Sequence, residues 1–365
     1  MSNTTLVSDT NEGVNAGAGL TLAAGVGCLV ATFVGFVTGA ELTAVPAIGF
    51  LAVTAYGWYE HQAATARGLT LLATVSTVLI LSLITFYLFA EAFPVFRAMG
   101  IRIVAFDDPL TLFGVTLIPP VESYWDTSAH VYSLTPMIWG TLTTTLIAMC
   151  VAAPLGIAGA LFISEIAPDA VREVVKPAIE ILAGIPSIVY GYLGFVTLNS
   201  YMMQNLGLPS FGSLFLVGLM IGLMALPTVV SVAEDALSTV PDPMKDGSLA
   251  MGVTDWQTMK SITIPAGFSG VSAAVLLGVG RAIGETMAAT VIIGHNQELP
   301  EPLYNVFGNT ETLTSLIASQ YGNADGTHLQ ALFAAGVVLF ITVLVISIAS
   351  QRIEERMERK LRGER

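Results

Sequence analysis

Apolar residues fall in eight blocks along the chain, separated by more polar stretches. A helix needs about 20 consecutive residues of this kind to cross a bilayer. The block at 42–59 is the weakest, because it is short and contains Pro46. The pattern predicts membrane spans at residues 18–40, 42–59, 69–90, 137–163, 178–199, 213–233, 268–294 and 329–350. The expected fold class is therefore an all-α polytopic membrane protein with about eight transmembrane helices.

The composition supports this class. Hydrophobic residues make up 54% of the 365 residues and charged residues only 11%, and the mean hydropathy is +0.74. These values lie far from those of soluble domains. The first 17 residues are polar and lack the basic start of a signal peptide, so we expect them to form a flexible tail.

The basic residues indicate how the chain is oriented. Eight spans place both ends on one side, and eleven of the 14 Lys and Arg would then lie on that side, six of them in 352–365. The positive-inside rule thus predicts a multi-pass protein of the cell membrane with cytoplasmic N- and C-termini. We expect the tail to be a solvated helix with i,i+4 pairs such as Glu355 with Arg359.

The net charge of −13 is unusual for a membrane protein. Many carboxylates would lie outside the cell, namely those of Glu91, Asp107, Asp108, Glu122, Asp126, Glu298, Glu301, Glu311 and Asp325. A strongly acidic surface is typical of organisms that live in high salt, where the Debye length falls to about 3 Å at 1 M. We therefore expect a halophilic source.

The sequence lacks the common motifs for nucleotide and metal chemistry. It has no GxxxxGK[ST] loop and no HExxH, and its two cysteines, Cys28 and Cys150, lie in distant apolar spans. We therefore expect no P-loop, metal site or disulfide. The stretch GFSG at 267–270 matches the GxSG of rhomboid-type intramembrane serine proteases. A protease is an alternative that the histidines argue against, because all four fall at span ends or in loops, away from this serine.

The most informative polar stretch is 234–265, which lies between two spans on the predicted cytoplasmic side. We expect a short helix over 244–251, a sharp turn at Gly252 and a second helix capped by Asp255. A helix–Gly–helix element on the membrane face suits the docking of a soluble partner.

This stretch resembles the EAA loop of ABC importer permeases, EAA-x3-G-x9-I-x-L-P. The spacing is kept by Asp246, Gly247, Ser248, Gly252, Ile262 and Pro265. The departures weaken the first helix, because a Gly costs about 1 kcal/mol relative to Ala. The resemblance implies a type I ABC importer (MetI-like) permease core whose loop couples to a separate ATPase subunit. ATP and Mg would be used by that partner, and no cofactor is expected in this chain.

Further segments resemble the phosphate ABC importer permeases, more closely those of the PstC type. They are 140–168, 180–191 (EILAGIPSIVYG) and 280–287 (GRAIGETM), the last followed by Ala, Ala and Thr. The resemblance implies four kinds of partner: a second permease subunit of the PstA type, two copies of an ATPase subunit, an extracytoplasmic phosphate-binding protein, and membrane lipid. The binding protein would dock on loops 91–136 and 295–328. No nucleic acid is expected.

Two charges stand inside the predicted span 268–294, Arg281 and Glu285. An unpaired charge at mid-bilayer costs at least ~2.5–3.5 kcal/mol, and the i,i+4 spacing predicts that the two share a helix face and pair. Two roles stay open: a salt bridge that locks helices together, or a polar substrate pathway where the guanidinium meets a phosphate oxyanion. Thr286 is a further pathway candidate. Glu180 precedes a Gly-Ile-Pro-Ser break and is either a gate or a packing contact.

These observations predict the transmembrane subunit of an ATP-driven importer for inorganic phosphate that works by alternating access and has no catalytic residue of its own. The alternatives are an ABC permease for another small oxyanion or solute, and an ion-coupled secondary transporter, which would not need a docking loop. The front of the chain has two more spans than the family. The expected domains are a tail (1–17), front spans with an extracytoplasmic loop (18–136), a permease core (137–350) containing coupling loop 234–265, and a charged cytoplasmic tail (351–365).

Overall fold

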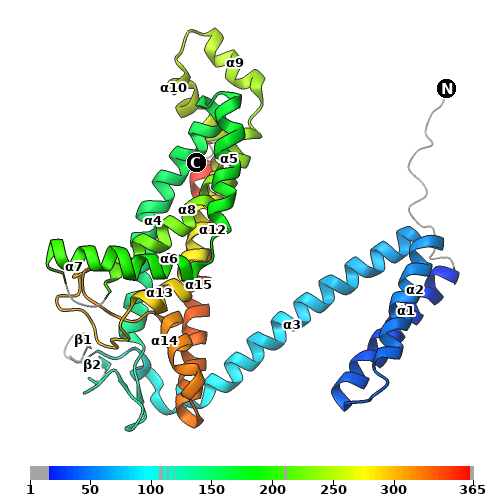
Figure 1. Cartoon of the computed structure of the whole chain (residues 1–365), viewed down its shortest axis with the longest axis horizontal. Coiled ribbons are helices and arrows are strands. Elements are labelled where there is room, and N and C mark those ends of the chain that lie inside the picture. The colour runs from blue at the N-terminus through cyan, green and yellow to red at the C-terminus, as the bar shows by residue number, and fades with distance from the viewer. Residues whose placement is uncertain (1–15, 107–109, 113–114, 119, 209–211, 362–365) are drawn as a thin grey trace. The chain divides into compact units, whose positions relative to one another are not determined.

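The chain divides into two compact units, residues 1–87 and 88–365 (Figure 1). The computed structural model describes residues 16–106, 110–112, 115–118, 120–208 and 212–361. Nearly all of the predicted N-terminal tail therefore lies outside the described residues. The start of the predicted permease core, residue 137, falls within the second unit.

The first unit consists of a helical hairpin and the beginning of a long helix. Its helix α1 (Ala16–Thr38) packs against α2 (Ala44–Glu60), and α3 (Gln62–Met99) follows after one residue. The hydroxyls of Thr32 and Thr70 donate to carbonyls four residues earlier, so they are satisfied inside their own helices. Most large apolar side chains of this unit are exposed, as expected for helices that face lipid.

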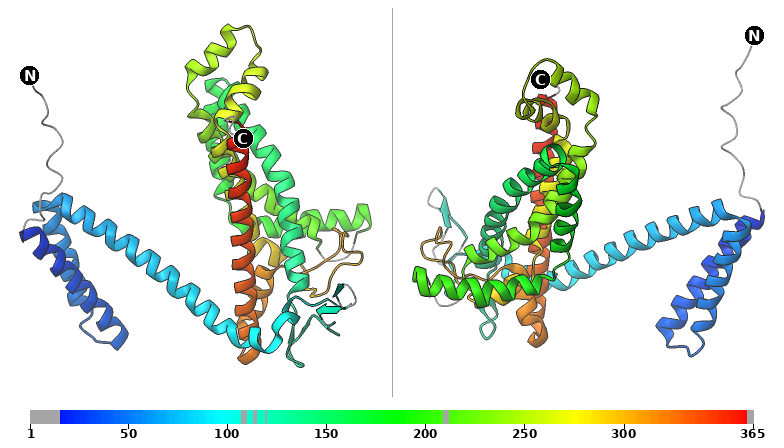
Figure 2. Two further views of the ribbon diagram at one scale, coloured as in Figure 1. Left: turned by 180° about the vertical axis from the view of Figure 1, so that it is seen from behind. Right: turned by 45° about the horizontal axis from the view of Figure 1, so that its top comes forward.

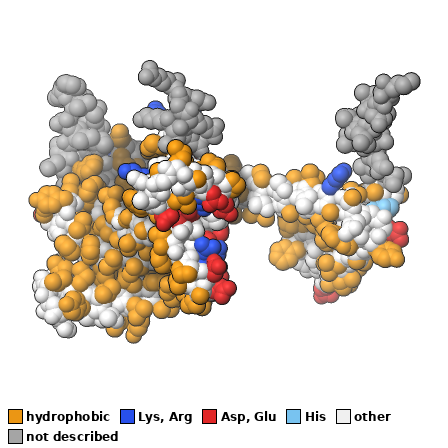
Figure 3. Space-filling view, turned by 90° about the horizontal axis from the view of Figure 1, so that it is seen from above, with side chains coloured by type: hydrophobic (Ala, Val, Ile, Leu, Met, Phe, Trp, Pro, Cys, Tyr) orange, Lys and Arg blue, Asp and Glu red, His pale blue; other side chains and the backbone are white. Residues whose placement is uncertain are grey.

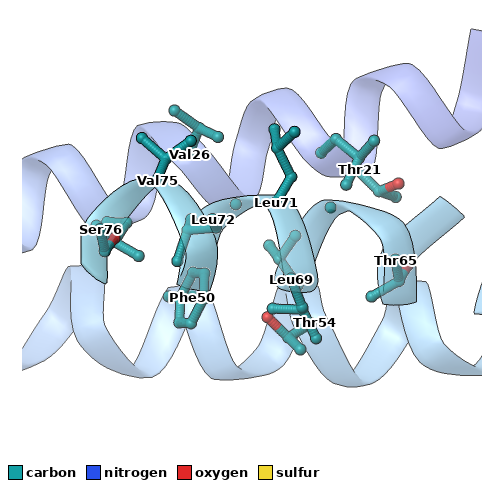
Figure 4. Close-up of a pocket in the computed structure, with 15 residues that line it drawn as sticks. Thr21, Val26, Phe50, Thr54, Thr65, Leu69, Leu71, Leu72, Val75 and Ser76 are labelled. Atoms are coloured by element: carbon teal, nitrogen blue, oxygen red, sulfur yellow. The ribbon is translucent and has the colours of Figure 1, made fainter. Parts of the chain in front are cut away.

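An apolar groove of about 360 Å³ lies between these helices. Side chains of all three helices line it, among them Val26, Phe50 and Leu72 (Figure 4). The groove shows that the described part of this unit is loosely packed compared with an ordinary helical core.

Helix α8 (Leu214–Ser238) is the centre of the second unit. It packs along α4 (Thr135–Leu161) and against α12 (Phe268–Ile283), and most of its residues are buried. Glycines allow the close approach, because a Cβ at Gly218 or Gly222 would lie within 3 Å of a backbone carbonyl of α4. Figure 2 shows these helices from two further sides.

The last helix, α15 (Gly326–Leu361), continues from its apolar part into the charged tail without a break. The predicted pair within the tail is present, with Arg359 Nη2 and Glu355 Oε2 3.8 Å apart. The tail therefore begins as the helix that the charge pattern predicts.

The predicted span 178–199 is not a single straight helix. Its residues belong to α5 (Asp169–Ala183), α6 (Ser187–Leu193) and the π-helical turn η3 (Gly194–Asn199). The π-helical turn η2 (Phe162–Ile166) precedes these elements, and α7 (Ser200–Leu206) follows them. The two helical parts meet at 87° where Gly184 and Pro186 interrupt the helix. Proline lacks the N–H of the helical ladder and disfavours a helical residue before it.

Five of the described helices are long and apolar enough to cross a membrane, or up to seven if each of two bent pairs counts as one crossing. The prediction of about eight spans is therefore slightly high by this measure. The difference is α2, which has only 17 residues. The protein is a multi-pass membrane protein in either count.

The region between α3 and α4 contains the only described strands, which the all-α prediction did not include. After the 3₁₀ turn η1 (Gly100–Val104), two antiparallel ribbons form, β1 (Leu110–Leu112) with β2 (Val115–Ile118) and β3 (Trp125–Asp126) with β4 (Val131–Tyr132). The second ribbon lies beside α14 (Leu313–Gln320), because Trp125 Nε1 donates to Gln320 Oε1 at 3.0 Å and the buried Trp125 and Tyr132 share a core with α14 and α15. The 3₁₀ turn η5 (Tyr321–Asn323) follows α14. We call this end of the second unit, formed by the described residues of 100–134 and 293–328, the ribbon end.

The opposite end of the second unit carries the stretch between α8 and α12 (Figure 1). It consists of α9 (Asp242–Ala250), α10 (Asp255–Thr258), the π-helical turn η4 (Met259–Thr263) and α11 (Ile264–Ala266). We call this region the loop end.

Candidate functional site

The predicted span 268–294 is broken at its charged residues. Helix α12 ends at Ile283, and α13 (Met287–Ile292) begins after a three-residue break formed by Gly284, Glu285 and Thr286. The expectation that Arg281 and Glu285 share a helix face is therefore wrong. The helix ends at Gly284: its N–H still makes the helical bond to the Gly280 carbonyl at 3.3 Å, whereas the N–H of Glu285 bonds to the Ala282 carbonyl, only three residues back, at 3.4 Å.

The predicted ion pair is not formed either. The carboxylate of Glu285 accepts the backbone N–H of Ala288 at 3.1 Å, so it caps the start of α13. The side chain of Thr286 donates to the Gly284 carbonyl at 3.2 Å. Arg281 is exposed, and it has no ion-pair partner among the residues that the structure describes.

The structure brings two of the sequence signatures together, because α6 packs against α13. A Cβ at Gly191 would lie 2.9 Å from the Cα of Ala288, so only a glycine permits this approach. The break before α6 is bridged by the hydroxyl of Tyr190, which donates to the Leu182 carbonyl at 3.2 Å. Glu180 lies on α5 just before this break, and its side chain is exposed.

A segment of the ribbon end holds the break in α12–α13. The hydroxyl of Thr314 donates to the backbone carbonyl of Glu285 at 2.7 Å. The same segment is fixed to α4, because the hydroxyl of Thr141 accepts the N–H of Leu313 at 3.0 Å. No local sequence pattern indicates this support, since the residues in contact lie 29 and 172 positions apart.

Glu311 is completely buried, although the sequence analysis placed it on the acidic outer surface. Its carboxylate is bonded to His295 Nδ1 at 2.9 Å, to the hydroxyl of Ser319 at 2.9 Å and to the side-chain amide of Gln297 at 3.4 Å. These bonds compensate for the loss of water around the carboxylate. A sequence signal existed in the capping box that follows, Thr312 with Ser315, which fixes residue 311 directly before a helix.

A polar cavity of about 780 Å³ lies at the ribbon end. Its lining includes His295 and three carboxylates, those of Glu122, Glu298 and Glu301. The neighbouring carboxylate of Asp126 has its pKa lowered by the hydroxyl of Ser128 and by backbone N–H groups, so it stays ionised. The described surface at this end is therefore strongly acidic.

The loop end has the predicted helix–Gly–helix form. The two helices α9 and α10 are separated by a turn in which Gly252 has a φ of +82°, a conformation that favours glycine. The predicted cap is wrong by one residue, because Thr254 rather than Asp255 caps α10, through a capping box with Gln257. A hydrogen bond of 2.7 Å between Ser248 and Thr258 ties the two helices together.

The predicted coupling residues divide into two groups. Asp246, Gly247 and Gly252 are exposed, whereas Ser248, Ile262 and Pro265 are partly buried. The most exposed apolar side chains of this end are ones that the sequence analysis did not select. They are Met251 and Trp256, which are 84% and 62% exposed.

Charged side chains gather over one area of the second unit when it is seen from this end, whereas hydrophobic side chains cover most of the remaining surface (Figure 3). Two lysines form ion pairs here, Lys245 on α9 of the loop end and Lys176 on α5. Lys245 lies 2.7 Å from Glu165, and Lys176 lies 2.7 Å from the buried Glu234 and 3.4 Å from Asp235.

The GFSG stretch does not form a protease site in the described structure. The hydroxyl of Ser269 donates to the carboxylate of Glu354 at 2.9 Å. The histidines at 130, 295 and 328 have their hydrogen-bond partners at the ribbon end. None of these three histidines is therefore placed to act as the general base that a nucleophilic Ser269 would need.

Comparison with known proteins places this arrangement in a family. Residues 152–363 match the model of the binding-protein-dependent transport system inner membrane component, and the chain belongs to that family. The match confirms the predicted membrane permease core.

Several relatives match most of this core. The probable ABC transporter permease protein YqgH of Bacillus subtilis is 37% identical over 227 residues, which cover 60% of this chain and 72% of that protein. The phosphate transport system permease protein PstC of Haemophilus influenzae is 36% identical over 257 residues, which cover 65% and 81%. A structure of the MetNI methionine ABC transporter in inward-facing conformations is similar over 61% of this chain and 95% of that one, with 21% identity and a TM-score of 0.49.

Proposed function

We propose that this chain is the transmembrane permease subunit of an ATP-driven importer for inorganic phosphate that works by alternating access. The observation that carries the proposal is the 36% identity to a phosphate transport system permease over 81% of that protein. The family match supports the same class of transporter.

The break in α12–α13 supports phosphate as the substrate. Non-helical backbone at membrane depth is tolerated where it lines a cavity, and transporters use such breaks to bind ions. The guanidinium of Arg281 lies one turn before the break and carries donors that suit an oxyanion. We assign Arg281 to substrate contact, and we assign Glu285 and Thr286 to the shape of the passage. Glu180 stays a candidate gate or packing contact at the second break.

The loop end is the proposed docking site for the ATPase. The sequence has no P-loop, so ATP and Mg²⁺ would bind to a separate subunit. The exposed side chains of Met251 and Trp256 are of the kinds, methionine and aromatic, that are enriched at protein–protein interfaces. We propose that α9 and α10 act as an EAA-type coupling element, in an assembly with two ATPase copies and a second permease of the PstA type.

The ribbon end is the proposed outer face, where a phosphate-binding protein would deliver its cargo. The carboxylates around the polar cavity would repel free phosphate, which favours delivery by a protein that docks there. High external salt would screen this repulsion, in agreement with the halophilic source that the net charge suggests.

Cytoplasmic location of both termini requires an even number of crossings. The helices that pass the length and composition criteria give up to seven. The eighth crossing would be α2, which with its 17 residues is about 26 Å long at 1.5 Å per residue.

Uptake of labelled phosphate into liposomes that contain the whole complex tests the proposal. Uptake should require ATP and this chain, should persist when ion gradients are collapsed, and should not be reduced by excess sulfate. Uptake of a different oxyanion alone would favour an ABC permease with another substrate. Uptake that follows an ion gradient without ATP would favour a secondary transporter.

A further inference from the structure

Helix α9 is attached to the protein in an unusual way. None of its residues is buried, so apolar packing does not hold it. Two polar contacts hold α9 instead. One is the hydrogen bond between Ser248 and Thr258 inside the loop end, and the other is the ion pair between Lys245 and Glu165.

The ion pair is short and largely withdrawn from water. Its N–O distance is 2.7 Å, and the side chains of Lys245 and Glu165 are only 15% and 10% exposed. Pairs in such places are weakly screened by salt, and the loss of one partner leaves a charge that water solvates poorly. Loss of one partner should therefore cost more here than in an ordinary surface salt bridge.

Glu165 is held firmly in place. It lies on η2, the last turn that continues α4. The guanidinium of Arg172 donates to the carbonyls of Ile163 and Ser164, each at 2.9 Å, and so covers the open end of this turn. A force applied to Glu165 thus acts on α4 as a whole.

The other end of α4 reaches the proposed substrate passage. α4 is one helix from Thr135 to Leu161, and Thr141 binds the backbone of Leu313. The next residue, Thr314, binds the Glu285 carbonyl in the break. A continuous series of short contacts therefore leads from α9 through α4 to the break.

We propose that Lys245 and Glu165 are a positioning pair that transmits movement of α9 to α4 and, through α4, to the break at residues 284–286. The proposal rests on the proposed function, in which α9 docks on the ATPase. It adds a route that bypasses α10 and α12, the elements that follow α9 in the chain. Lys176 and Glu234 do not belong to this route, because they join α5 to α8.

Charge reversal tests the pair in the complete transporter. The variants are Glu165→Lys, Lys245→Glu and the double reversal, and the matched control is Arg356→Glu, which changes an exposed cation of α15 outside the loop end. The first readout is phosphate taken up per ATP hydrolysed. Each single reversal should lower this ratio at least tenfold, and the double reversal should restore it to within threefold of wild type. The control should leave it unchanged.

A second readout does not depend on the substrate. A cysteine at Met287, beside the break and half exposed, is labelled with a maleimide in a background with Cys28→Ala and Cys150→Ala. ATP with vanadate should change the labelling rate in the otherwise wild-type complex and in the double reversal, but not in the single reversals. This measurement decides the inference even where no phosphate is transported, in which case only the proposed substrate is wrong.

Two results would overturn the inference. In one, the single reversals keep both the uptake ratio and the change in labelling. In the other, the double reversal recovers neither. If a single reversal prevents assembly with the ATPase, the neutral variants Glu165→Gln and Lys245→Met decide: assembled complexes with a normal ratio would contradict the role, and a low ratio would support it.

Discussion

The loop end and the ribbon end of the second unit keep their ionised groups in contrasting surroundings. At the loop end, Lys245 and Glu165 join elements 80 residues apart, and the helix that carries Lys245 has no buried residue. At the ribbon end, Glu311 has no exposed surface and is enclosed by three polar partners, next to a core that contains Trp125.

The difference indicates which end is able to move. A helix held by two polar contacts is displaced when those contacts break, without exposing apolar surface. Displacement of the segment around Glu311 would instead strip a buried carboxylate of its partners and open a packed core. We infer that the loop end transmits motion. The ribbon end is then the rigid part relative to which the break in α12–α13 moves.

The largest effect of a substitution on stability is expected at the rigid ribbon end. A Cβ at Gly140 would collide with the backbone carbonyl of Glu311, which has no room to yield. Gly140→Ala should therefore lower the free energy of unfolding by about 3 kcal/mol, the upper part of the range for overpacking. Thermal unfolding in detergent measures it, with Gly280→Ala as the control, since an added Cβ there meets no atom within 4 Å. Equal melting temperatures of the two variants would contradict rigid packing of the ribbon end around Gly140.

An intermediate effect is expected at the buried carboxylate. Glu311→Gln keeps the size of the side chain but removes the charge that His295 and Ser319 face. The free energy of unfolding should fall by about 2 kcal/mol, as for other hydrogen bonds to charged groups. Glu298→Gln changes an exposed carboxylate of the polar cavity at the same end and should alter the free energy of unfolding by less than about 0.5 kcal/mol. An equal loss in both variants would mean that burial is not the cause.

The smallest effect is expected at the loop end, and its sign should depend on position. Gly252→Ala places a Cβ on a residue with a φ of +82° and should destabilise the turn by about 1 kcal/mol. Gly247→Ala lies within α9, meets no atom within 4 Å and should stabilise that helix by up to about 1 kcal/mol. Hydrogen exchange of the α9 amides should become faster in the first variant and slower in the second. A change of the exchange rate in the same direction in both variants would show that the turn at Gly252 does not control the stability of α9.

The sequence predicted the features that depend on neighbouring residues. Apolar blocks located the long helices, and Gly252 between two polar helical segments located the turn of the loop end. The charged tail was recognisable as a helix from the spacing of Glu355 and Arg359.

The features that depend on distant residues could not be predicted in this way. The i,i+4 rule led to a pair between Arg281 and Glu285, but the helix ends at Gly284 and Thr314 supports the break from 29 residues away. Charge alone placed Glu311 at the surface, whereas its partners at 295, 297 and 319 bury it. The ion pair of Lys245 was equally hidden, because nothing local to position 245 indicates Glu165.

The central claim is that phosphate passes the break beside Arg281 when ATP is hydrolysed. The most direct measurement is the initial rate of ATP-driven uptake of labelled phosphate by liposomes with the complete complex, for wild type, Arg281→Lys and Arg281→Gln. The account predicts that Arg281→Gln abolishes uptake while the complex still assembles, and that Arg281→Lys keeps part of it, because a lysine retains the charge without the paired donors. Uptake at the wild-type rate by an assembled Arg281→Gln complex would contradict it.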